Sequence, residues 1–135
     1  MAVTHSAASE RSPATGRRSV TILGSTGSIG CSTLDLVARN RESFDLAAIT
    51  AHSNVAALAA QAREHRPRLA VIGQDTHYAA LKEALAGTGI EVAAGAQAVV
   101  EAAERPSDWV MAGIVGVAGL APTLSAVRRG ACVAL

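Results

Sequence analysis

The chain has 135 residues, half of them hydrophobic, and a formal net charge of +1 at pH 7. This length suits one domain with a real core, and the composition excludes a disordered polyelectrolyte. The balanced charge and the scarcity of aromatic residues (one Phe, one Tyr and one Trp) argue against nucleic acid or an anionic membrane as a partner, and no apolar run is long enough to span a bilayer.

The amino-terminal segment differs from the rest of the chain. Residues 1–18 are polar and lack the apolar stretch of a secretory signal, so we expect a disordered tail followed by one domain over residues 19–135. Cys31 and Cys132 lie far apart and form neither a metal-binding spacing nor a disulfide framework. Such cysteine usage is typical of a reducing compartment and predicts a cytoplasmic protein.

From Ser19 onward, short apolar runs alternate with helical patterns. The strands are predicted at 19–23, 44–51, 68–73, 90–94, 108–115 and 131–135. The helices between them are predicted from the glycine-rich turn to about Asn40, over 55–65, from Asp75 to about Ala86, over 96–104 and from Pro122 to Arg129. This alternation predicts the α/β class, with a doubly wound, Rossmann-like parallel sheet covered by helices on both faces.

Within these helices, some side chains have predicted structural roles. The first helix is expected to bury an apolar stripe formed by Ile29, Thr33, Leu36 and Val37. Asn54 and Asp75 are predicted to cap the next two helices. The chain ends inside an apolar strand, and we expect it to be a fragment truncated before a further domain.

A glycine-rich turn, Gly-Ser-Thr-Gly-Ser-Ile-Gly, occupies residues 24–30 between the first strand and the first helix. In this context Gly24 permits a tight turn, Gly27 lets the backbone approach a pyrophosphate, and Gly30 allows close packing of helix and sheet. Free N–H groups at the helix start would face the phosphates. The alternative is that the glycines merely close a tight turn.

Hydroxyl groups within the same turn could add hydrogen-bond donors. These groups belong to Ser25, Thr26 and Ser28. The spacing G-x-x-G-x-x-G is a variant found in reductases that prefer NADP, and the absence of a Lys after the last glycine excludes a P-loop.

The end of the second strand bears on which dinucleotide is bound. A typical NAD site has a carboxylate there for the ribose hydroxyls, whereas residues 50–54 read Thr-Ala-His-Ser-Asn. His52, Ser53 and Asn54 could instead donate to a 2′-phosphate, which favours NADP(H). The alternative role of Ser53 and Asn54, capping the next helix, is compatible with binding.

Two stretches resemble a known family. VTILGSTGSIGCSTLD at 20–35 and VMAGIVGVAGLAPTLSAVRRG at 110–130 are similar to the amino-terminal NADPH-binding portion of 1-deoxy-D-xylulose 5-phosphate reductoisomerases. The likeness runs from about Ser19 to Leu135 and covers roughly the first third of a family member.

The resemblance implies roles for individual residues. The phosphates and ribose of the cofactor would be contacted by Thr26, Gly27, Ser28 and Ile29. Ser53 and Asn54 would lie near the 2′-phosphate, although many relatives carry Gly and a basic residue where this chain has His52 and Ser53. Residues 111–113 would approach the nicotinamide.

The resemblance also implies an activity. The family converts 1-deoxy-D-xylulose 5-phosphate to 2-C-methyl-D-erythritol 4-phosphate in non-mevalonate isoprenoid biosynthesis, using NADPH and a divalent ion, Mg or Mn. It combines isomerase and oxidoreductase chemistry and forms homodimers. The catalytic residues and metal ligands are expected in a later domain, so this chain alone should be inactive.

Other hypotheses remain open from the sequence. One is another G-x-x-G-x-x-G reductase of the aspartate-semialdehyde dehydrogenase type, against which the segment 110–130 argues. A second is a free-standing NADP-binding module without catalysis. Cys31 follows the last glycine near a helix start, but a buried role as a small residue is favoured over reactivity.

Overall fold

The computed structural model describes residues 17–114 and 119–134. Six parallel strands form one sheet in the order β4-β3-β2-β1-β5-β6. The strands are β1 (Arg18–Leu23), β2 (Phe44–Ala51), β3 (Leu69–Ile72), β4 (Glu91–Ala94), β5 (Trp109–Ala112) and β6 (Cys132–Ala134). The strand order reverses beside β1, as a doubly wound sheet requires, and the predicted fold class is confirmed.

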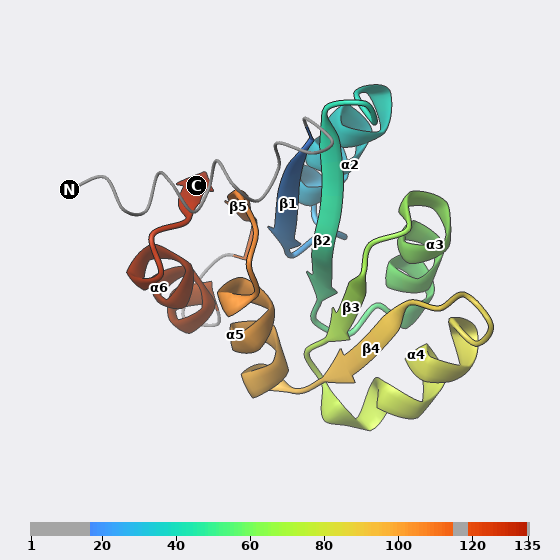
Figure 1. Ribbon diagram of the computed structural model, residues 1–135. Coiled ribbons are helices and arrows are strands. Elements are labelled where there is room, and N and C mark those ends of the chain that lie inside the picture. Colours follow the sequence, from blue (N-terminus) through green and yellow to red (C-terminus); the bar gives the residue numbers. More distant parts are fainter. Residues whose placement is uncertain (1–16, 115–118, 135) are drawn as a thin grey trace.

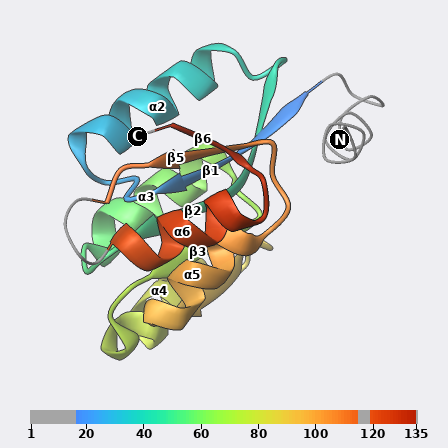
Figure 2. The ribbon, with the colours of Figure 1, turned by 90° about the vertical axis from the view of Figure 1, so that its left-hand side faces the viewer.

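Helices cover both faces of the sheet. They are α2 (Ser28–Arg39), α3 (Val55–His65), α4 (Tyr78–Ala84), α5 (Ala96–Glu104) and α6 (Leu120–Arg128). Figure 1 shows α2, α3 and α4 on one side of the sheet and α5 and α6 on the other. Figure 2 shows the same division from a second direction, with α2 and α6 separated by the strands. Each right-handed crossover places its helix on the face set by the direction in which the chain moves across the sheet. This direction is the same from β1 to β4 and reverses between β4 and β5, so α5 and α6 lie on the opposite face from α2, α3 and α4.

The core has one layer on each side of the strands. On one face, Ile22, Ile49 and Ile72 are fully buried beneath the helices α2, α3 and α4. On the other face, the alanines of α5 and α6, among them Ala102 and Ala126, are also fully buried. Alanine leaves little bulk between helix and sheet, so the alanine-rich sequence allows α5 and α6 to lie close to the strands.

The predicted stripe on α2 is largely wrong. The side of α2 that packs on the core is formed by Gly30, Leu34 and Val37, whereas Ile29 and Leu36 are 50% and 59% exposed. Ile29, Thr33 and Leu36 line an apolar groove of about 440 Å³ instead. The helix therefore has two apolar faces, and helical spacing alone does not tell which of them packs on the sheet.

Other boundaries differ in smaller ways. Asp75 opens a short 3-10 turn, η1 (Asp75–His77), and neither this turn nor α4 has a side-chain cap, so the capping role predicted for Asp75 is wrong. Asn54 does cap α3, and its Oδ1 accepts from Ala57 N at 3.1 Å. β1 begins one residue earlier than predicted, at Arg18, whose N–H donates to Ser43 O at 2.8 Å.

Parts of the predictions lie outside the described residues. They are most of the predicted tail, the last residue of the predicted fifth strand and Leu135. Among the helices of the described ranges, none has the length and apolar character needed to cross a membrane.

Candidate functional site

The glycine-rich loop lies at the carboxyl edge of the sheet, between β1 and α2. Gly24 has a φ of +79°, which confirms that the tight turn requires glycine, and its N–H donates to Thr50 Oγ1 at 3.0 Å. Ser25 N donates to Thr50 O at 2.7 Å. A Cβ on Gly24 would lie 3.0 Å from the backbone of Gly113, just beyond β5. The ends of three adjacent strands therefore hold the start of this loop.

The first turn of α2 is open to an incoming anion. Gly27 occupies the N-cap position and offers no side-chain cap, and the first amide to find a partner along the helix is Cys31 N, which donates to Gly27 O at 2.8 Å. Within the described residues, the N–H groups of Ser28, Ile29 and Gly30 have no acceptor. These groups lie at the positive end of the helix dipole, so the site favours a phosphate.

Two glycines of the loop are needed for different reasons. A Cβ on Gly30 would lie 2.3 Å from Gly24 O and 2.5 Å from Ser25 Cα, because the loop folds back over the helix start. Glycine is required at this position, but the predicted packing of helix against sheet is not what requires it, because the nearest atoms belong to the loop itself. A Cβ on Gly27 would meet Gly24 O at 3.6 Å, an ordinary contact, and Gly27 is exposed. The surface at Gly27 can thus accept the backbone approach of a pyrophosphate.

The three predicted hydroxyl donors are not equivalent. Ser25 is fully buried and its hydroxyl donates to Gln61 Oε1 at 2.8 Å, so its predicted role as a phosphate donor is wrong. Thr26 is half-buried and Ser28 is exposed, which leaves both accessible to a ligand.

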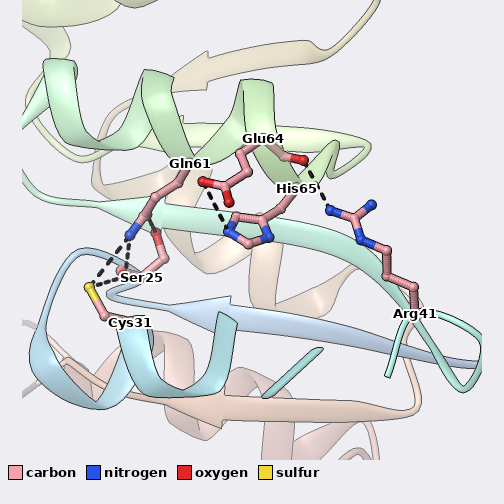
Figure 3. A network of polar contacts seen from close by, with 6 residues as sticks. All are labelled: Ser25, Cys31, Arg41, Gln61, Glu64 and His65. Carbon is pink, nitrogen blue, oxygen red and sulfur yellow. Dashed lines mark hydrogen bonds and ion pairs between the residues drawn. The ribbon is translucent and has the colours of Figure 1, made fainter. Parts of the chain in front are cut away.

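Gln61 was not identified from the sequence, because it is 36 positions away from Ser25. Figure 3 shows its side chain reaching from α3 to Ser25 and Cys31. A glutamine beside the buried Ala62, in a helix otherwise rich in alanine, was the available signal.

The loop after β2 forms the other end of the candidate site. His52, Ser53 and Asn54 are all exposed. Asn54 uses Oδ1 as the cap of α3, while its Nδ2 group makes no hydrogen bond to the described residues and can still donate to a ligand. Capping and ligand binding are therefore compatible at Asn54.

The loop after β3 contacts the loop after β2 through Gln74. Gln74 N donates to His52 O at 3.0 Å, which brings the loop after β3 against the loop after β2. The carboxylate of Asp75 lies against Gly95, where a Cβ would be 2.8 Å from Asp75 Oδ1. Gln74, which meets His52 in this contact, is uncharged.

The residues predicted near the nicotinamide border the glycine-rich loop. Met111 pairs with Ile22 across β1 and β5, and Gly113 N donates to Leu23 O at 2.8 Å. Met111 also lines the apolar groove beside Ile29. Among the residues that the structure describes, no group of three or more His, Cys, Asp or Glu side chains could hold a metal ion.

Comparison with protein families gives a match over nearly the whole described chain. The model of the 1-deoxy-D-xylulose 5-phosphate reductoisomerase family matches residues 20–135. The enzyme of that name from Rhodospirillum centenum is 62% identical over 119 residues, which are 88% of this chain and 30% of the relative. The enzyme from Rhizobium rhizogenes is 60% identical over 121 residues. The chain thus spans about 30% of the length of these curated relatives.

Solved structures agree with this match. The reductoisomerase from Zymomonas mobilis in complex with NADPH superposes with a TM-score of 0.87 at 52% identity, covering 89% of this chain and 32% of that one. A reductoisomerase in complex with NADPH, fosmidomycin and magnesium superposes with a TM-score of 0.82 at 35% identity, covering 87% of this chain and 29% of that one.

Proposed function

The chain belongs to the 1-deoxy-D-xylulose 5-phosphate reductoisomerase family, and from this premise we propose that it binds NADPH along the carboxyl edge of its sheet. The observation that carries the proposal is the open start of α2, where the amides of Ser28, Ile29 and Gly30 lack acceptors among the described residues. A pyrophosphate placed over Gly27 would satisfy them. The Zymomonas mobilis relative was solved with NADPH, which supports this choice of ligand.

Each part of the site has a proposed task. The pyrophosphate and the adjoining ribose lie against Thr26, Gly27, Ser28 and Ile29. Asn54 Nδ2 and the Ser53 hydroxyl donate to the 2′-phosphate, which meets no carboxylate in residues 50–54. Residues 111–113 support the nicotinamide, whose reduced ring supplies hydride when NADPH is bound.

For the whole protein we propose the family's reaction. It converts 1-deoxy-D-xylulose 5-phosphate to 2-C-methyl-D-erythritol 4-phosphate, as a homodimer in the cytoplasm, and takes no part in nucleic-acid binding. The described residues contribute binding and orientation of the dinucleotide. They include no group of three or more His, Cys, Asp or Glu side chains that could hold a metal ion, and the divalent ion of the family's reaction would be held by other residues of the whole protein.

Titration of the complete protein with NADPH and with NADH, followed by nicotinamide fluorescence, tests the proposal. We expect NADPH to bind at least tenfold more tightly, because a single charge-assisted contact to the 2′-phosphate corresponds to about that factor. Tighter binding of NADH would overturn the cofactor assignment.

Two other functions are separated from this one by further observations. The family match over residues 20–135 favours the reductoisomerase over a reductase of the aspartate-semialdehyde dehydrogenase type. A binding module without catalysis would bind NADPH but leave the sugar phosphate unchanged. Oxidation of NADPH that depends on 1-deoxy-D-xylulose 5-phosphate and a divalent ion, measured on the complete protein, distinguishes the two.

A further inference from the structure

We propose that Gln61 is a positioning residue for the dinucleotide, which holds the glycine-rich loop in the shape that presents its amides to the pyrophosphate. The inference rests on the proposed NADPH site and extends it to a side chain that would not itself touch the ligand. Gln61 lies on α3, whereas the loop joins β1 to α2 (Figure 3).

The contact uses both polar atoms of the Gln61 amide. Ser25 Oγ donates to Gln61 Oε1 at 2.8 Å, and Gln61 Nε2 donates to Ser25 O at 2.9 Å. A ring of two hydrogen bonds with one residue fixes the position and the rotation of that residue together. Because Ser25 is fully buried, water cannot readily replace either bond if Gln61 is lost.

The consequence for the site follows from where Ser25 lies. Its backbone is pinned on one side by Thr50, through Ser25 N to Thr50 O at 2.7 Å, and on the other by Gln61. The next residues along the chain, 26–29, are those proposed to contact the phosphates. The Gln61 amide also reaches Cys31 in the first turn of α2, with Nε2 3.6 Å from Cys31 Sγ. Gln61 therefore joins the two segments that flank the phosphate-binding amides.

The position of Gln61 on α3 also links the two ends of the site. Asn54 caps the start of this helix, and Gln61 follows it by seven residues, about two turns or 10 Å along the axis. The same helix thus carries the proposed 2′-phosphate contact at its start and, about two turns later, the loop tether, by which we mean the two hydrogen bonds between Gln61 and Ser25. A variant that disturbs the tether alone should affect the pyrophosphate and leave the 2′-phosphate contact intact.

The test compares two ligands on the complete protein. Gln61→Met keeps the length of the side chain but removes both hydrogen bonds, and Gln97→Met alters an exposed glutamine of α5 as the matched control. Dissociation constants are measured for NADPH by fluorescence and for adenosine 2′-monophosphate, which has no pyrophosphate, by competition. We expect Gln61→Met to raise the value for NADPH about tenfold and that for adenosine 2′-monophosphate less than twofold, while Gln97→Met changes neither.

Each other outcome has a defined meaning. Unchanged NADPH binding in Gln61→Met, with normal binding by the wild type, overturns the positioning role alone. An equal loss for both ligands also overturns it, since Gln61 would then act only on the integrity of α3. A wild-type protein that binds neither ligand overturns the proposed function as well.

A second set of variants tests the same contact in case Gln61→Met does not fold. Gln61→Glu can still accept from Ser25 Oγ but cannot donate to Ser25 O, and should raise the dissociation constant of NADPH with the same selectivity. Ser25→Ala removes one of the two bonds and should have a smaller effect. Unchanged NADPH affinity in Gln61→Glu would overturn the inference. Where Gln61→Met folds, adding Ser25→Ala to it should weaken NADPH binding by less than Ser25→Ala does in the wild type, because the bond to Ser25 Oγ is already lost, and full additivity would overturn the inference.

Discussion

The two loops of the candidate site are built in different ways. The glycine-rich loop is held from three sides, by Thr50, by Gln61 and by the backbone of Gly113. The loop after β2 is exposed at His52, Ser53 and Asn54, and is shaped mainly by the cap of α3 and its contact with Gln74. Available space therefore limits residue choice at the first loop, whereas the proposed function makes charge the deciding property at the second.

The largest effect is expected at Gly30, where the difference in space is greatest. Gly30→Ala places a Cβ 2.3 Å from Gly24 O, a backbone atom that cannot move aside without displacing the loop. We expect the free energy of unfolding to fall by about 3 kcal/mol or more, measured by urea denaturation. Gly87→Ala is the control, because its Cβ meets nothing within 4 Å and its φ of +80° should cost only about 1–2 kcal/mol. A smaller loss for Gly30→Ala than for the control would refute the steric argument.

Gly27→Ala separates ligand binding from stability in the same loop. The added methyl has room, and the φ of −77° suits any residue, so the free energy of unfolding should change by less than about 0.5 kcal/mol. The methyl would nevertheless stand where the pyrophosphate approaches, and we expect the dissociation constant of NADPH to rise at least tenfold in a fluorescence titration. Unchanged affinity would show that this loop is not the phosphate site.

Asn54→Asp tests the role of charge at the second loop. Asp caps helices as well as Asn, so the bond to Ala57 N should survive, while the new carboxylate would repel a 2′-phosphate. We expect the preference for NADPH over NADH to fall about tenfold, as one unfavourable charge contact of about 1.4 kcal/mol implies.

Asn54→Ala is the control for this change. It loses the cap, at a cost of about 1 kcal/mol in stability, without adding charge. Calorimetric titration of both dinucleotides measures the ratio, and a ratio unaltered in Asn54→Asp would place the 2′-phosphate elsewhere.

The smallest effect is expected at Cys31. Its thiol is exposed, and its contacts are long, 3.7 Å to Ser25 O, 3.6 Å to Thr26 O and 3.6 Å to Gln61 Nε2, so the predicted burial of this residue is wrong. Cys31→Ala should change the free energy of unfolding by less than about 0.5 kcal/mol and NADPH affinity by less than twofold. A larger loss of affinity would mean that the loop depends on the thiol as well as on Gln61.

The order of elements could be predicted from the sequence because each signal is local. Alternating apolar runs and helical patterns set the strands and helices, and β2 and α5 have the predicted bounds. The tight turn at Gly24 and the cap at Asn54 could likewise be predicted, since each depends on the backbone within a few residues. The strands, helices and turns around the proposed site can therefore be predicted from short segments of the sequence.

Contacts between distant segments were decided by the tertiary structure. Helical spacing could not tell that Leu34 packs on the core while Leu36 faces the groove, because both choices give α2 an apolar side. The sequence alone predicts that the Ser25 hydroxyl can donate to a phosphate. In the fold, this hydroxyl donates to Gln61 of α3 instead. Local sequence fixes which backbone groups a residue can offer, whereas only the packing of elements far apart in the chain determines which of those groups remain for a ligand.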